Sequence, residues 1–414
     1  MNKYIFGRVC ALPGTYIVLI MCVLLAVSAF ISINLVGIYT GDSNRYLSLA
    51  RNLAQGNGFS AAEQAPFYPE VFRAPLYPLF LSVLLRCGLG EMGTVIVQIV
   101  LYLLAAVISV KLALELTSQS FAAILVGIFL CGYAPLVRWA ASITTESLCT
   151  VLFCITCYSF VSYIKRPTWW ITSILGLGAT GLFFTRTTYI TVAVLIIALS
   201  LYRLHNRATL RYSLALSLII VLPVAGWVIR NMTIMPGSFH PFGIGTGMAL
   251  YVKSLELQKP DYDKRTEAIM NKTEFQIVHT ESRLPDVVEA DEALKREAIG
   301  VIRSHKLQYV LDVAILSIAR QWIEVYNPGL PRPLLFAIMC ISAAMLFTSY
   351  VGMFLIGARF DVLSIIAMCF SVAFIHAVFV VEARYTSPVR PVLYIFSAFT
   401  VSYIISKTGE RFLQ

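Results

Sequence analysis

The sequence has little charge. Only 13% of its 414 residues are Asp, Glu, Lys or Arg, whereas 58% are hydrophobic, and the mean hydropathy is +0.77. A soluble domain carries about 25% charged residues. A chain this apolar would aggregate in water, so we expect lipid to be its solvent. The composition therefore excludes an ordinary soluble enzyme.

Several other features are also missing. The first apolar run, residues 14–37, is followed by no small-residue cleavage site, so we predict a retained helix rather than a signal peptide. Most of the nine cysteines lie inside apolar runs, where thiols pack as small hydrophobes, and Cys154-x-x-Cys157 is one such case. The five histidines show no metal-ligand spacing, so we predict no cofactor, although a divalent cation stays open. The net charge of +10 is scattered over the ends of apolar runs, which argues against nucleic acid as a partner.

The sequence does contain many uncharged runs of the length that crosses a bilayer, about 20 residues. We therefore predict an all-α polytopic membrane protein of about ten transmembrane helices. The predicted spans are residues 14–37, 94–110, 121–137, 147–164, 167–185, 187–202, 212–229, 333–358, 362–381 and 391–406.

The short loops rich in Lys and Arg predict the orientation, because such loops stay in the cytoplasm. With both termini cytoplasmic, the outer segments are residues 38–93, 138–146, 186, 230–332 and 382–390. The predicted organisation has three parts. Residues 1–229 form an N-terminal membrane module that includes the first outer loop, 38–93. Residues 230–332 form an extracytoplasmic helical cap with an interfacial helix at 307–326, and residues 333–414 form a C-terminal membrane module. Short amphipathic helices are expected at 45–54 and 76–85.

Arginine recurs at the outer ends of the predicted helices, where the orientation rule gives no reason for it. A guanidinium binds phosphate through a planar fork, so a ring of arginines suits an anionic headgroup. Alternatively, each arginine pairs with a local acid or extends to lipid phosphates. The five positions are Arg73, Arg138, Arg186, Arg230 and Arg384.

Acidic residues outside the cap are few, and two lie at predicted helix ends on the outer side. Asp42 follows the first span, and Glu146 begins the fourth. A carboxylate there is a candidate general base for an acceptor hydroxyl or amine. The alternatives are a turn or cap for Asp42 and a helix N-terminal cap for Glu146. The glycines of Gly243-x-Gly245-x-Gly247 lack a βαβ context, so we interpret them as a flexible loop.

An ordered set of motifs resembles the GT-C glycosyltransferases, in particular the dolichyl-phosphate-mannose–protein mannosyltransferases and the lipid A aminoarabinose transferase. The first-loop match runs from Gly41-Asp42 through Tyr46 to Phe72-Arg73-Ala-Pro-Leu-Tyr77-Pro78. The later matches are Thr145-Glu146-Ser147-Leu148, Thr185-Arg186, Trp227-x-x-Arg230-Asn231 and Glu382-x-Arg384-Tyr385-x-x-Pro388.

The resemblance implies roles for these residues. Asp42 matches the family's catalytic acid and Glu146 a second acid near it. Arg73, Arg186, Arg230, Arg384 and Tyr385 would bind the donor phosphate, and Tyr46, Tyr77 and Asn231 would line the site. Where the mannosyltransferases often have an Asp-Glu pair, Ser43 follows Asp42 here, and their separate lumenal sugar-binding domain is absent. These departures favour a compact bacterial enzyme.

The predicted function is transfer of a sugar from a polyprenyl-phosphate donor to a glycan, lipid or protein acceptor, with inversion. The reaction would take place on the periplasmic face of a bacterial inner membrane, among membrane lipids. The alternative is a secondary transporter or flippase of a lipid-linked or anionic substrate. A transporter would place charges near the bilayer midplane and repeat its halves, whereas here the charges lie at one face.

Overall fold

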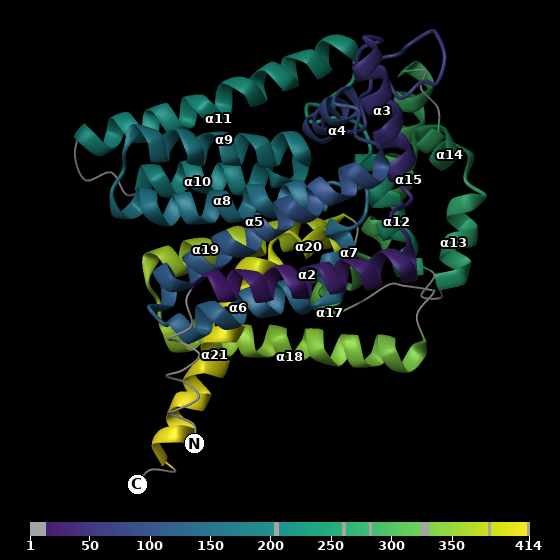
Figure 1. Cartoon of the computed structure of the whole chain (residues 1–414). Helices are drawn as coiled ribbons and strands as arrows, with labels where there is room; N and C mark the ends of the chain where they lie inside the picture. Colours follow the sequence, from purple (N-terminus) through teal and green to yellow (C-terminus); the bar gives the residue numbers. More distant parts are fainter. Residues whose placement is uncertain are drawn as a thin grey trace.

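The computed structural model describes residues 14–202, 207–258, 262–280, 284–323, 331–379 and 382–411. Every regular element within these ranges is a helix, and most of the long helices run side by side (Figure 1). The prediction of an all-α membrane protein is confirmed.

Six helices in the described ranges are long and apolar enough to cross a membrane. Each of them contains one of the predicted apolar runs or most of it. They are α2 (Gly14–Val36), α5 (Glu91–Thr117), α8 (Glu146–Lys165), α11 (Arg207–Ile234), α18 (Arg332–Ile356) and α19 (Phe360–Val378).

The remaining predicted runs also form helices. Three of them give broken or shorter helices, and the run 391–406 lies within one helix of 22 residues. The run 121–137 is broken into α6 (Ser120–Gly132) and α7 (Ala134–Ala140), which meet at 64°. The described residues thus give six candidate spans, or seven if this bent pair is one span, and the count of ten is not confirmed. The other helices are α9 (Trp169–Thr185), η1 (Thr187–Tyr189), α10 (Ile190–Tyr202) and α21 (Arg390–Arg411).

Large apolar side chains cover the outside of these helices. On α18, Phe336, Phe347 and Phe354 are 69%, 69% and 85% exposed. A contiguous apolar surface of this kind is unfavourable in water and favourable against lipid tails. Between the helices, the largest hydrophobic cluster includes residues such as Leu112, Phe153 and Phe396. The chain is therefore a multi-pass membrane protein whose interior and lipid-facing surface are both apolar.

Residues 38–93, the predicted first outer loop, form the two short helices that were predicted, α3 (Ser43–Gln55) and α4 (Leu76–Arg86). They pack on each other and on α5 through a separate hydrophobic cluster that includes Leu47, Tyr77 and Val95. Figure 1 places α3 and α4 at the same end of the long helices as α12–α15. This end of the molecule carries the predicted site residues.

The segment 230–332 contains the helices that lie beyond the long bundle. Val278, Leu294 and Tyr251 form their own hydrophobic cluster, and Val71 from the first loop is part of it. The helices packed together here are α12 (Thr246–Gln258), α13 (Tyr262–Met270), α14 (Thr273–Thr280) and α15 (Leu284–Ser304). The cap is therefore packed onto the first loop by shared apolar contacts.

The predicted interfacial helix at 307–326 consists of three consecutive helical pieces, and its last residues lie outside the described ranges. The pieces are α16 (Lys306–Leu311), the π-helical η2 (Asp312–Ser317) and α17 (Ile318–Ile323). A π-turn places residues five apart above one another. Asp312 and Ser317 are such a pair, since Ser317 donates to Asp312 at 2.6 Å. Both hold the fully buried ammonium of Lys253 from α12, which ties the cap to this segment.

The close contact between α18 and α21 predicts a sensitive position. A Cβ on Gly352 would lie 2.1 Å from the Phe396 carbonyl oxygen, which is part of the backbone of α21. We expect Gly352→Ala to destabilise the protein by about 1–3 kcal/mol, because overpacking forces the two helices apart. Thermal unfolding in detergent measures the effect. Gly226→Ala on α11 is the control, because nothing lies within 4 Å of its added methyl group, and a drop as large as that of Gly352→Ala would contradict the packing argument.

Candidate active site

Asp42 lies directly before α3, at the position where an aspartate usually caps a helix. Its side chain makes no capping hydrogen bond. Instead, Oδ1 accepts from Arg73 Nη2 at 2.5 Å, and Oδ2 lies 2.8 Å from Arg384 Nη1. Both carboxylate oxygens are thus held by guanidinium groups from distant parts of the chain. The alternative that Asp42 is simply a cap does not describe this geometry.

Arg384 is positioned by the short helix α20 (Ala383–Thr386). The Thr386 hydroxyl donates to the Gln321 carbonyl oxygen at 2.8 Å, and Arg390 Nη2 donates to the same oxygen at 2.7 Å. The Gln321 side chain in turn donates to the Ala373 carbonyl oxygen on α19 at 3.0 Å. α20 is therefore anchored to α17, and through it to a long helix.

Tyr385 lies between two of the predicted arginines. The guanidinium of Arg186 is 4.7 Å from the centre of its ring, and that of Arg384 is 5.1 Å away. The His376 ring stacks on Tyr385 at 4.5 Å. Because an aromatic ring attracts a cation to its face, Tyr385 keeps two like-charged groups close together.

Glu146 begins α8 and is 1% exposed. Its Oε1 accepts from Arg186 Nη2 at 2.8 Å, and the same nitrogen donates to Thr145 Oγ1 at 2.9 Å. The carboxylate has the predicted place in the first turn of a helix. It is also an ion-pair partner, so the helix-cap alternative gives only part of its role.

The electrostatics of Asp42 follow from this arrangement. Burial raises the pKa of its carboxyl group, but the Arg73 and Arg384 guanidiniums outweigh burial and hold the pKa below the ordinary value. The arginines are not saturated by these acids. Within the described residues, Arg73 Nε and Arg186 Nη1 are buried and have no hydrogen-bond partner. Buried donors of this kind usually have a partner, so the cluster retains capacity for an anionic ligand.

Arg230 lies beside this cluster rather than in contact with Asp42. Its Nη2 donates to the Glu70 carbonyl oxygen at 2.8 Å, and its Nη1 donates to Asn231 Oδ1 at 2.8 Å. Its guanidinium also lies 4.6 Å from the ring centre of Trp227. Asn231 donates to the Pro241 carbonyl oxygen at 3.1 Å, so it supports Arg230.

The two tyrosines of the first loop form successive layers. The Arg73 guanidinium lies 5.3 Å from the ring centre of Tyr46, and Tyr77 meets the Tyr46 ring edge-on at 5.0 Å. Tyr77 is fully buried, and its hydroxyl donates to Gln98 at 2.6 Å. Tyr46 therefore contacts the charged cluster, whereas Tyr77 supports Tyr46 from behind.

The glycines at 243, 245 and 247 pack closely. A Cβ on Gly243 would lie 2.5 Å from the Val71 carbonyl oxygen, and one on Gly245 would lie 2.5 Å from the Phe72 ring. The Ile244 amide donates to Val71 at 2.9 Å. The interpretation as a flexible loop did not foresee these contacts. They bring the cap close against the residues that precede Arg73.

Sequence reasoning also missed Glu70 and Arg45. Glu70 is 3% exposed and pairs with Arg45 through both oxygens. The sequence feature that could have indicated Glu70 is its place three residues before Arg73, in a loop with few other acids. Arg138, which was among the predicted outer arginines, lies on α7 beside Trp139 at 4.8 Å, and its Nε and Nη1 have no partner within the described residues.

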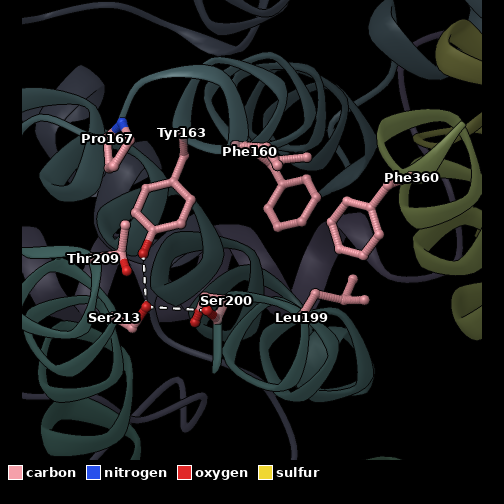
Figure 2. Close-up of a pocket in the computed structure, with 9 residues that line it drawn as sticks. Phe160, Tyr163, Pro167, Leu199, Ser200, Thr209, Ser213 and Phe360 are labelled. Atoms are coloured by element: carbon pink, nitrogen blue, oxygen red, sulfur yellow. Dashed lines mark hydrogen bonds between the residues drawn. The ribbon is translucent and has the colours of Figure 1, made fainter. Parts of the chain in front are cut away.

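No group of three or more potential metal ligands occurs in the part of the chain that the structure describes. A pocket lies elsewhere, near the far end of α8 (Figure 2), where Tyr163 and Ser213 form a hydrogen bond at 2.9 Å. Phe160 in its wall is about 21 Å along the helix from Glu146. This pocket is lined by apolar and hydroxyl groups, so it is not the charged site.

Part of the chain matches a known protein family. Residues 72–227 match the family model "Dolichyl-phosphate-mannose-protein mannosyltransferase", a stretch that contains Arg73, Glu146 and Arg186. Asp42, Arg230 and Arg384 lie outside it. The comparison with curated proteins gives no match.

The fold is similar to that of the oligosaccharyltransferase of Archaeoglobus fulgidus. A structure of that protein with a tethered acceptor peptide has 16% identity and a TM-score of 0.52, and one with an inhibitory peptide and a dolichol-phosphate has 14% and 0.51. Both similarities cover 94% of this chain and 50% of the other, so the chain spans about half the length of the oligosaccharyltransferase. ArnT from Cupriavidus metallidurans, bound to undecaprenyl phosphate, is 16% identical over 94% of this chain and 78% of its own, with a TM-score of 0.43.

The resemblance stated from the motifs is thus supported by an independent family match and by the fold. The chain resembles the GT-C superfamily in its helical architecture, and in residues 72–227 it resembles the dolichyl-phosphate-mannose–protein mannosyltransferases.

Proposed function

We propose that this protein is a glycosyltransferase that moves a sugar from a polyprenyl-phosphate donor to an acceptor at the outer face of the membrane. The observation that supports this most directly is Asp42 held between Arg73 and Arg384. The site combines a candidate base with a set of guanidiniums that still have free donors. Such a pairing suits a reaction in which an acceptor loses a proton while a phosphate leaves.

The lipid-linked donor is inferred from three supports. The matched family is named for a dolichyl-phosphate sugar. The A. fulgidus enzyme has been seen with a dolichol-phosphate, and it shares this fold. The helices here also offer an apolar surface for an isoprenoid tail beside a charged end for the phosphate.

In the donor complex, the phosphate oxygens would accept hydrogen bonds from the unpaired N–H groups of the arginines. Arg73, Arg186 and Arg384 carry three positive charges against the buried carboxylates of Asp42 and Glu146 and the more exposed Glu382. An incoming phosphate competes with Asp42 for Arg73 and Arg384. Asp42 then becomes a stronger base, because its pKa is no longer held down by two undivided ion pairs.

The transfer step needs no further reactant. Asp42 takes the proton from the acceptor hydroxyl or amine as the acceptor atom bonds to the anomeric carbon. The bond from that carbon to the phosphate oxygen breaks, and its electron pair leaves with polyprenyl phosphate. The arginines stabilise the charge that develops on this oxygen. Attack opposite the leaving group inverts the anomeric centre. The chemistry is assigned to side chains alone, and the prediction that no cofactor is needed stays a prediction.

The location and the acceptor belong to the same proposal. The site lies at one end of the long helices, where the first loop and the cap meet (Figure 1). The charge rule for loops makes this the extracytoplasmic side, and a bacterial inner membrane is the proposed setting. The acceptor is a glycan, a lipid or a protein.

The direct test is reconstitution into vesicles with a radiolabelled polyprenyl-phosphate sugar on one side. We expect label to appear on an added acceptor extract together with release of polyprenyl phosphate. Movement of intact donor across the bilayer without release of the carrier would instead identify a flippase. If the protein neither transfers the sugar nor binds the donor, the proposal is refuted.

Asp42→Asn separates the chemical step from binding. We expect transfer to fall by about 10²–10⁴-fold, the range for loss of a general base. Donor binding should persist, because the arginines remain and one competing charge is gone. The measurement is the initial rate at saturating donor together with donor affinity. The control is Asp361→Asn, which removes an arginine-paired carboxylate on α19, and near-normal transfer by Asp42→Asn would remove Asp42 from the mechanism.

The pH dependence tests the electrostatics of Asp42. In Arg384→Gln, burial still raises the pKa of Asp42 but one of the two contacting guanidiniums that lower it is gone. The ionised form is the active base, so activity is lost as the pH falls through this pKa. We therefore expect the acid limb of the kcat/KM profile to move to higher pH in Arg384→Gln. Arg359→Gln, which removes the partner of Asp361, should leave the limb in place, and an unshifted limb in Arg384→Gln would contradict the assignment.

A further inference from the structure

Glu70 is a buried carboxylate that touches neither Asp42 nor Glu146 in any contact described above. It is 3% exposed, and a carboxylate in such a place is stable only when it is paired and hydrogen-bonded. Arg45 supplies the pair, with Nε at 3.1 Å and Nη2 at 3.0 Å from Oε2. The contacts of the other oxygen show what this costly charge holds in place.

The second carboxylate oxygen organises the backbone that leads to Arg73. Oε1 accepts from the Phe72 amide at 2.6 Å and from the Arg73 amide at 3.0 Å. A side-chain oxygen that accepts from the amides two and three residues later fixes a tight turn. The turn therefore sets where the Arg73 side chain begins, and so whether its guanidinium reaches Asp42.

The main chain of Glu70 holds a second arginine. Its carbonyl oxygen accepts from Arg230 Nη2 at 2.8 Å, and its amide donates to the Phe59 carbonyl oxygen at 2.8 Å. Arg230 comes from the end of α11, far from the first loop in sequence. Glu70 thus contacts both arginines: its side chain accepts from the Arg73 amide, and its carbonyl oxygen accepts from the Arg230 guanidinium.

The cap closes on the same turn from the other side. Gly243 and Gly245 approach the Val71 carbonyl oxygen and the Phe72 ring so closely that a methyl group would not fit. The turn of residues 70–73 is therefore held between the Arg45 ion pair, the Arg230 side chain and the glycine loop of the cap.

We propose that Glu70 is a positioning residue that sets Arg73 and Arg230 at the spacing needed to bind one donor phosphate. This inference rests on the proposed function and adds a residue to it. The Arg45 ion pair fixes the orientation of the carboxylate, and the two amide contacts transmit that orientation to Arg73. Glu70 itself does not meet the substrate.

The test is the affinity of the purified protein in nanodiscs for undecaprenyl phosphate, the donor carrier without its sugar. Glu70→Gln loses the charge and places an amide donor against Arg45. We expect its Kd to rise about tenfold or more, because the loss of one hydrogen bond to a charged group weakens binding by about this factor. Glu70→Asp keeps the charge and shortens the reach, so it should bind with intermediate affinity.

A double variant distinguishes positioning from general destabilisation. If Glu70 acts through Arg73, then Glu70→Gln in an Arg73→Ala background should weaken binding by clearly less than it does in the wild type. The control Asp361→Asn removes a carboxylate that is likewise paired with an arginine and bonded to a backbone amide, but it lies on α19. Its melting temperature is expected to fall while its Kd stays unchanged.

The outcomes separate the two proposals. Wild-type protein that does not bind undecaprenyl phosphate would refute the donor assignment and this inference together. Wild-type binding with an unchanged Kd in Glu70→Gln, or with effects that multiply fully in the double variant, would refute the positioning role alone. If Glu70→Gln does not fold, an unchanged Kd in Glu70→Asp would refute it as well.

Discussion

The structure depends on one ionic contact, the Asp42 carboxylate held by Arg73 and Arg384. The three residues come from the start of α3, the end of the first-loop turn and the short helix α20 near the C-terminus. Buried charges are stable only with partners at good geometry, so each of these segments must be placed accurately before the contact can form. The anchors described above have this purpose. Gln321 holds α20, Glu70 holds the turn, and Lys253 ties the cap to the π-helix that precedes α17.

Burying this cluster of charges costs desolvation free energy. Replacing a buried ion pair by well-packed apolar groups is often neutral or stabilising, so stability alone does not explain five charges at one place. The aromatic contacts point the same way. Tyr385 lies against both Arg186 and Arg384, and Tyr46 and Phe72 lie against Arg73 at 5.3 and 4.5 Å. Each ring attracts the guanidinium that lies against it, which favours holding like charges close together.

The sequence allowed the helical class and most helix positions to be predicted, because apolar runs and lipid thickness are local properties. It also allowed Asp42, Arg73, Arg186 and Arg384 to be grouped, because arginine at an outer helix end is conspicuous. The count of ten spans was not confirmed, since the run 121–137 bends by 64° and two others form short helices. Glu70 and the glycines of the cap were missed because their roles are contacts across long stretches of chain. A buried acid and a packing glycine look in sequence like a surface acid and a loop glycine.

The charges of the cluster limit how a phosphate-linked donor would bind and react. Arg73, Arg186 and Arg384 face the buried carboxylates of Asp42 and Glu146, and the more exposed Glu382 also pairs with Arg384. Counted with Glu382, three arginines are matched by three acids. A sugar linked to a polyprenyl phosphate is a phosphodiester with one negative charge, so it would have to compete with these acids for the guanidiniums. In the proposed transfer, the phosphate would gain a second negative charge as the sugar leaves, while Asp42 would lose its own by accepting the acceptor proton. The total charge of the site is then the same before and after transfer. Because the proton would stay within the site, the role left to the guanidiniums is to stabilise the charge that develops on the phosphate oxygen, as preorganised donors do.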